Sequence, residues 1–170
     1  MSLSLYDASI PGYVRMLRNL SAFLDKAETY AAEEGVALST FTEASLGHGM
    51  APFTRQIQFA SDAAKSAAAR LAGVEPPSMP DTETTFPELK ERIAKTIAFV
   101  ETIKREQVDG QEEREIVLKF PNGSMTFTGQ DFLLTFSLPN FHFHVTTAYD
   151  ILRSQGVPLG KMDYLAGPQS

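Results

Sequence analysis

The stretch LPNFHFHVTTAYDILR, residues 138–153, predicts the last of four principal helices. We expect this helix to end at Gly156, because glycine often follows a helix C-terminus. Pro139 has no backbone N–H and cannot lie deep inside an uninterrupted helix. The sequence therefore predicts either a kink at Pro139 or a fresh helix start with Ser137 as the N-cap, after an earlier cap-like start at residues 128–131.

Three further helices are predicted toward the N-terminus, from apolar residues that recur at three- and four-residue steps. The first runs from Ile10 to near Gly35, and the second runs from near Pro52 to Gly73. The residues expected on the buried side of the second helix are Met50, Phe53, Ile57, Ala60, Ala64 and Leu71. The third begins in the capping-box sequence of residues 85–88, after a connection at residues 74–81 that contains three prolines.

Between the third and fourth helices the apolar residues change from helical spacing to strict alternation, which predicts a β-hairpin. Asn-Gly at residues 122–123 favours a type I′ turn, because both central residues of that turn need a positive φ. This turn sets Phe120 opposite Met125. It also sets Leu118 opposite Phe127, so one face of the hairpin is apolar and must pack on the helices or on a partner chain.

Length and composition predict one domain over residues 1–170, and the residue periodicity predicts an all-α plan of four principal helices with the hairpin inserted between the third and fourth. The chain has 170 residues and is 43% hydrophobic, enough for a single core. The segment 157–165 is expected to pack back on the bundle, and residues 167–170 are expected to fray. The N-terminus lacks the basic and apolar regions of a signal peptide and no stretch is apolar enough to span a membrane, so we expect a cytoplasmic protein with no membrane partner.

Charge and residue usage exclude several classes of function. With 15 Lys and Arg against 21 Asp and Glu, the net charge is −6, which argues against nucleic-acid binding. The absence of cysteine excludes disulfides, zinc–thiolate sites, iron–sulfur clusters and cysteine nucleophiles. Imidazole chemistry must therefore use His48, His142 or His144.

Helical spacing separates these histidines. His142 and His144 are two residues apart, so on a helix they point in opposite directions and cannot share a metal. His144 shares its face with Asn140 and Thr147, and Asn140 is four residues away, a spacing at which two side chains reach one small object. His48 reaches that face only if the start of the second helix lies beside the start of the fourth. The alternative is that each histidine is simply hydrogen-bonded or exposed.

Polar residues of the second helix leave two interpretations open. Gln58, Asp62 and Lys65 form one stripe, which is typical of a solvated face with an ion pair. Alternatively, Gln56 or Gln58 lies at the rim of a pocket and Asp62 orients a group inside it.

Several segments together resemble the DinB/YfiT-like superfamily, in a subgroup described only as a domain of unknown function. They are Leu138–Arg153 followed by Gly156-Val157, Ser4–Ser9, Leu20–Ala27, Arg55–Gln58 and Asp62–Lys65. The resemblance covers nearly the whole chain. It implies a single DinB-like domain folded as an up-and-down four-helix bundle, which in this superfamily is usually dimeric, so we expect a homodimer.

The resemblance also implies what a metal site would need. Many members of the superfamily hold a divalent metal with three histidines, two from a His-x-x-x-His pair on the late helix and one from the second helix. Here the late pair is Asn140 and His144, and the second-helix candidates are glutamines unless His48 substitutes. These departures argue against metal-dependent catalysis. They leave a labile site for nickel, zinc or manganese, with His144 and His48 as the metal ligands.

Two hypotheses for function follow, and neither decides whether the protein is an enzyme. In the first, a degenerate metal-type pocket binds a small ligand or a weakly held divalent metal. Its candidate ligand-binding residues are Asn140, His144, Gln56, Gln58, Asp62 and Thr147. In the second, the protein is a non-enzymatic structural or interaction protein, and these residues only satisfy buried polar groups. A His144 that is hydrogen-bonded and sealed from any cavity would favour the second hypothesis, and an open cavity containing density beside His144 would count against it.

Overall fold

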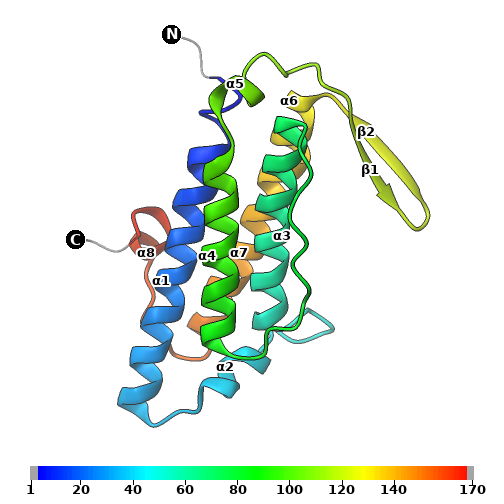
Figure 1. Ribbon diagram of the computed structural model, residues 1–170. Helices are drawn as coiled ribbons and strands as arrows, with labels where there is room; N and C mark the ends of the chain where they lie inside the picture. The colour runs from blue at the N-terminus through cyan, green and yellow to red at the C-terminus, as the bar shows by residue number, and fades with distance from the viewer. Residues whose placement is uncertain (1–3, 168–170) are drawn as a thin grey trace.

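The computed structural model describes residues 4–167, and four long helices form its core (Figure 1). They are α1 (Ile10–Glu34), α3 (Phe53–Ala72), α4 (Phe86–Thr102) and α7 (Leu138–Ser154). The shorter elements are α2 (Leu38–Glu43), α5 (Arg105–Val108), α6 (Gly129–Asp131), the π-helix η1 (Phe132–Ser137), α8 (Lys161–Leu165) and the strands β1 (Ile116–Phe120) and β2 (Gly123–Phe127). The predicted bundle with a hairpin between the third and fourth helices is confirmed. No helix in the described part of the chain is long and apolar enough to cross a membrane.

The predicted helix ends are also confirmed. Gly35 and Gly73 follow α1 and α3 in the left-handed conformation, which glycine adopts without steric cost. Thr85 and Glu88 form the capping box at the start of α4. The placing of Met50 on the buried side of the second helix was wrong: α3 begins only at Phe53, and Met50 is 37% exposed in the preceding loop.

The helices do not simply alternate in direction. The rings of Phe53 and Phe86, at the starts of α3 and α4, stack with centroids 5.8 Å apart, so these two helices run parallel. Residues 73–85 therefore run back along the bundle before α4 begins (Figure 1). A connection of this length spans about 40 Å when extended, whereas α4 is roughly 25 Å long, so the chain reaches easily.

A buried arginine holds this returning segment against the bundle. Arg92 of α4 is 2% exposed. Its guanidinium contacts Asp62 of α3 at 2.9 Å, Asp81 at 3.0 Å and Glu83 at 3.1 Å. A buried guanidinium needs such partners, because an unpaired buried charge is strongly unfavourable. Arg92 thus ties two helices and the proline-rich connection together.

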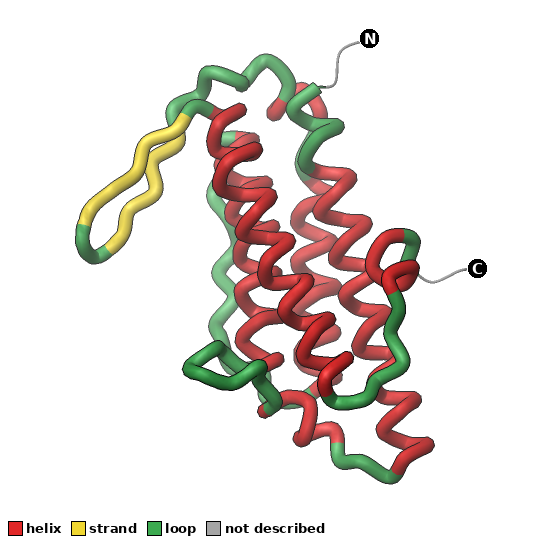
Figure 2. The backbone as a smooth tube through the Cα atoms, turned by 180° about the vertical axis from the view of Figure 1, so that it is seen from behind, coloured by secondary structure: helices red, strands yellow, loops and turns green. Residues whose placement is uncertain are grey.

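The hairpin extends away from the bundle (Figure 2), and its register differs from the prediction. Leu118 pairs with Met125 and Phe120 with Gly123, so Phe120 is not opposite Met125 and Leu118 is not opposite Phe127. The turn is centred on Pro121 and Asn122, because proline is favoured at the second position of a turn and glycine at the fourth. A shift of two residues keeps the same side chains on the same face, so the apolar face survives.

The fourth helix is continuous from α6 through η1 into α7, and its irregularity lies just before Pro139. Ser137 has helical backbone angles and makes no side-chain cap, so the predicted alternative of a fresh start at Ser137 was wrong. The Leu138 N–H instead bonds the carbonyl of Leu133, the five-residue step of a π-helix. The Ser137 hydroxyl is 2.6 Å from the Tyr13 hydroxyl in the core, which joins this turn to α1.

The C-terminal segment packs back on the bundle as predicted. Val157 and Leu159 are buried, and the Asn19 side chain of α1 donates a 2.8 Å hydrogen bond to the carbonyl of Tyr164 in α8. Of the residues expected to fray, Gly167 is buried, and residues 168–170 lie outside the described part of the chain.

Candidate functional site

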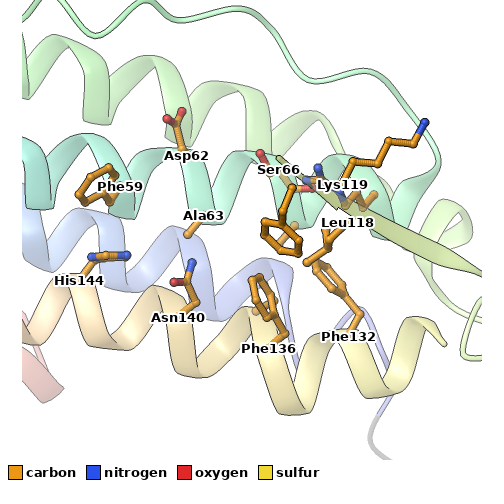
Figure 3. Close-up of a pocket in the computed structure, with 14 residues that line it drawn as sticks. Phe59, Asp62, Ala63, Ser66, Leu118, Lys119, Phe132, Phe136, Asn140 and His144 are labelled. Atoms are coloured by element: carbon orange, nitrogen blue, oxygen red, sulfur yellow. Dashed lines mark hydrogen bonds between the residues drawn. The ribbon is translucent and has the colours of Figure 1, made fainter. Parts of the chain in front are cut away.

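An open cavity of about 270 Å³ lies between α3, the η1–α7 helix and the hairpin (Figure 3). Its α3 wall contains Phe59, Asp62, Ala63, Ser66, Ala67 and Arg70. The other walls contain Leu118, Lys119 and Phe120 from the hairpin, and Phe132, Phe136, Ser137, Asn140 and His144 from η1 and α7. Two predicted site residues, Asn140 and His144, therefore share one cavity, together with Asp62.

Gln56 of α3 forms a hydrogen bond with His144 of α7. His144 Nδ1 is 2.8 Å from Gln56 Oε1, and Gln56 Nε2 donates a 3.0 Å hydrogen bond to the Ala51 carbonyl. Gln56 is 2% exposed and lies two residues before Gln58, so it faces away from the stripe of Gln58, Asp62 and Lys65. The Ala51 carbonyl can accept only the amide N–H, so the oxygen of Gln56 must face His144. The pair joins the start of α3 to the middle of α7.

This contact determines the tautomer of His144. Because Gln56 presents an oxygen, Nδ1 must carry the hydrogen, and Nε2 of the neutral ring keeps its lone pair. In Figure 3 the far ring nitrogen of His144 is directed along the cavity toward Asn140. Burial lowers the pKa of His144 below its ordinary value of 6.5. The cavity therefore contains a neutral hydrogen-bond acceptor near pH 7.

Asn140 lies one turn before His144 on the same face, as predicted. It is partly exposed in the cavity, and its side-chain amide makes no hydrogen bond to any group within residues 4–167. An amide offers both a donor and an acceptor. Asn140 and His144 can therefore both hydrogen-bond to the same polar group of a ligand.

Gln58 and Asp62 face a different part of the molecule. Gln58 accepts from Arg55 at 2.7 Å and donates to Glu83 at 2.9 Å, on the side of the returning connection. Asp62 is paired with Arg92 at 2.9 Å and Lys65 at 3.0 Å. Its carboxylate points away from His144 (Figure 3). The predicted ion pair of this stripe forms between Asp62 and Lys65, but the predicted solvated face was wrong, because Gln58 and Lys65 are buried. Asp62 only borders the cavity.

Three other residues named from the sequence lie outside the cavity wall. The Thr147 hydroxyl donates to the Phe143 carbonyl at 2.7 Å within α7. His142 points the other way from His144, with Nδ1 3.1 Å from the Tyr164 hydroxyl, as the spacing predicted. His48 is exposed in the turn before α3, with a φ of 50°. Because α3 and α7 run antiparallel, the start of α3 lies beside the middle and end of α7 and not beside its start (Figure 1).

The donor groups do not fit a resident divalent metal. Residues 4–167 contain no group of three or more His, Asp or Glu side chains arranged to hold one. The Gln56 oxygen already accepts the Nδ1 hydrogen of His144, and the Asp62 carboxylate is held in ion pairs with Arg92 and Lys65. Beside His144 Nε2, the Asn140 amide is therefore the candidate metal ligand. One imidazole and one amide are too few strong ligands for nickel, zinc or manganese.

The sequence interpretation missed most of the cavity wall. On α3, Phe59, Ala63 and Ser66 follow each other at helical spacing, and this pattern was a usable signal. On the fourth helix, Phe132, Phe136, Asn140 and His144 are spaced by four residues. Such a row drifts around an α-helix of about 3.6 residues per turn, and the longer π turn at η1 partly reverses that drift. The row therefore stays along one cavity.

Comparison with known proteins places these features in a family context. The chain matches the family described as Domain of unknown function (DUF1993) over residues 5–165. It is also similar to a crystal structure, at 1.83 Å resolution, of a DinB family member protein from Shewanella denitrificans. The two chains are 36% identical and give a TM-score of 0.89, over 98% of this chain and 94% of that chain. No curated protein matches the chain.

Proposed function

The chain belongs to the DUF1993 family of DinB-like proteins, and from this premise we propose that it binds a small organic molecule in the cavity beside His144. The observation that carries the proposal is the Gln56–His144 hydrogen bond, which leaves Nε2 of His144 as an acceptor in an open cavity. A volume of about 270 Å³ suits a ligand at the small end of the usual range.

The polar and apolar residues of the cavity would make different contacts with a ligand. Asn140 and His144 supply hydrogen bonds at one end, and Phe132, Phe136 and Leu118 supply apolar surface. A donor group of the ligand, such as a hydroxyl, would bond Nε2 of His144. A neutral imidazole that is held by a second residue is also suited to accept a proton, so His144 is the candidate general base if the protein is an enzyme.

The test uses phenol as a probe that is aromatic and carries one hydroxyl donor. In ¹H–¹⁵N correlation spectra of the full chain, we expect phenol to shift the amide signals of Ala63 and Asn140, and toluene to bind more weakly. The variants His144→Leu and Ala63→Leu should weaken phenol binding about three- to tenfold, the former by removing one hydrogen bond and the latter by filling the cavity.

Matched variants serve as controls. His142→Leu removes the histidine on the opposite side of α7, and Ala94→Leu enlarges an exposed side chain on α4. Neither should change phenol binding. If phenol does not shift the cavity signals, or binds His144→Leu and Ala63→Leu as well as it binds the natural sequence, the proposed function is wrong. That outcome would favour a structural role for Asn140 and His144.

The homodimer and the cytoplasmic location expected from the sequence remain proposals. Support for self-association comes from large apolar side chains that are exposed on η1, α7 and the hairpin: Leu134, Phe143, Phe120 and Met125. Protein interfaces are enriched in such aromatic and methionine side chains. Light scattering during size-exclusion chromatography should give twice the chain mass, and Phe143→Ser should lower it. A monomer at all concentrations would contradict the homodimer.

A further inference from the structure

The cavity has two chemically different ends. Phe59 and Arg70 lie 11 residues apart on α3, which makes the α3 wall about 16 Å long. His144 and Asn140 lie near Phe59 (Figure 3), whereas Phe132 and the β1 residues lie toward the end of α3. A ligand lying along this wall would contact the hydrogen-bonding groups of Asn140 and His144 at one end and the residues around Arg70 at the other.

The far end carries positive charge that the protein does not neutralise. Among the charged residues that line the cavity, Asp62 is paired with Arg92 and Lys65. Arg70 and Lys119 form no ion pair within residues 4–167. Arg70 makes one long hydrogen bond, 3.3 Å to the Ser66 carbonyl, so most of its N–H groups are available. Lys119 extends outward at the same end (Figure 3).

Apolar surface separates the two ends. The rings of Phe132 and Phe136 stack with centroids 6.0 Å apart, and Leu118 of the hairpin is buried beside them in the same wall. Phe120 extends this surface toward the solvent and is 46% exposed. A planar or alkyl body fits such a wall, because it removes apolar surface from water without leaving polar groups unpaired.

We propose that the ligand is a small organic acid, with its anionic group at Arg70, an aryl or alkyl body beside Phe132 and Phe136, and a hydrogen-bonding group at Asn140 and His144. This inference rests on the proposed function, since it names the chemical class that the cavity takes. Lys119 lies at the same end, extends outward and adds to the positive potential there. The overall charge of −6 repels anions, so anion binding would depend on this local positive charge.

The test compares three probes by ¹H–¹⁵N titration of the full chain: 4-(4-hydroxyphenyl)butanoate, its primary amide and 4-phenylbutanoate. We expect the hydroxylated acid to bind about fivefold tighter than its amide, and this preference to weaken at high salt. The acid without the hydroxyl should bind about threefold more weakly and lose the shift at Asn140. In Arg70→Gln the preference for the acid should fall, and in the Arg70→Gln/Lys119→Gln double variant the acid and the amide should bind equally.

Arg18→Gln is the matched control, because Arg18 is exposed on α1 away from the cavity and should keep the preference for the acid. Equal binding of the acid and the amide to the natural sequence would overturn the inference and leave the proposed function intact. A preference that survives in the Arg70→Gln/Lys119→Gln double variant would also overturn it. If phenol binds but none of the acids does, only the inference fails; if phenol fails as well, both fail.

Discussion

His144 Nδ1 lies 2.8 Å from Gln56 Oε1, and this contact joins α7 directly to α3. In a three-histidine site the two helices would be joined through the metal. Here a direct hydrogen bond joins them, and the Ala51 carbonyl fixes the orientation of the amide. The same bond therefore has a structural effect, holding α3 to α7, and a chemical effect, leaving Nε2 of His144 free.

Removing the Gln56 side-chain amide should destabilise the fold. Gln56→Leu leaves the Ala51 carbonyl and the Nδ1 hydrogen of His144 without their partner in a partly buried site, so we expect a loss of about 1–2 kcal/mol in unfolding free energy. Urea denaturation measures this loss. Gln130→Leu, at an exposed position, should change stability by less than about 0.5 kcal/mol. Equal stability of Gln56→Leu and the natural sequence would contradict the geometry.

Stability should fall when the pH is lowered below 6.5. Burial lowers the pKa of His144, and burial together with Arg15 lowers that of His142, so the unfolded chain takes up protons first as the pH falls. Stability is then complete above pH 6.5 and decreases below it. The carboxylates whose pKa is lowered titrate at more acidic pH, so they do not affect this window.

Urea midpoints at pH 7.5 and pH 5.5 measure the effect, with NMR titration of both imidazoles. His142→Asn/His144→Asn should reduce the pH dependence. An imidazole signal of His144 that titrates above pH 6.5 would show that the charged form is favoured in the fold, against this prediction.

Nickel, zinc and manganese should not stabilise the protein through His144. Elemental analysis of protein purified without an affinity tag should find less than one metal per chain. Any rise of the thermal midpoint with these ions should be the same in the natural sequence and in His144→Ala. Gln56→His/Asn140→His should supply two further imidazoles and raise the midpoint by about 5–10 °C at metal concentrations a hundredfold above Kd. A rise in the natural sequence that His144→Ala removes would show that His144 binds a metal, against this prediction.

Arg92 should be among the most costly side chains to replace. Arg92→Met leaves Asp62, Asp81 and Glu83 without their shared buried partner, so we expect a loss of roughly 3–5 kcal/mol in unfolding free energy. Lys95→Met breaks only an exposed pair with Glu91 and should cost less than about 0.5 kcal/mol. Similar unfolding curves for the two variants would show that Arg92 does not anchor the returning connection.

Local features were predicted well because they depend on neighbouring residues. The capping box of Thr85 and Glu88 and the glycines that end α1 and α3 are short-range interactions. The opposite orientation of His142 and His144 follows from two residues of helical rotation. The hairpin was placed correctly, but its register was not, because Pro121 and Gly123 suit a turn that competes with the Asn-Gly turn.

The site could be predicted only in part. Asn140 and His144 belong to one helix, so their spacing was sufficient to pair them. Which of the two glutamines contacts His144 depended on the rotation of α3 against its neighbours. Gln56 contacts His144, and Gln58 contacts Glu83. Both glutamines are 2% exposed, so neither burial nor residue type distinguishes them.

The sequence by itself determined the helices, their ends, the hairpin and the face on which Asn140 and His144 lie, because side-chain spacing along one element follows from backbone geometry. Only the tertiary structure decided that α3 and α4 run parallel and that Arg92 binds the connection between them. It also decided which nitrogen of His144 is free, because that depends on a hydrogen bond between residues 88 positions apart. Contacts of this kind depend on how whole helices rotate and cross, and no local pattern encodes them.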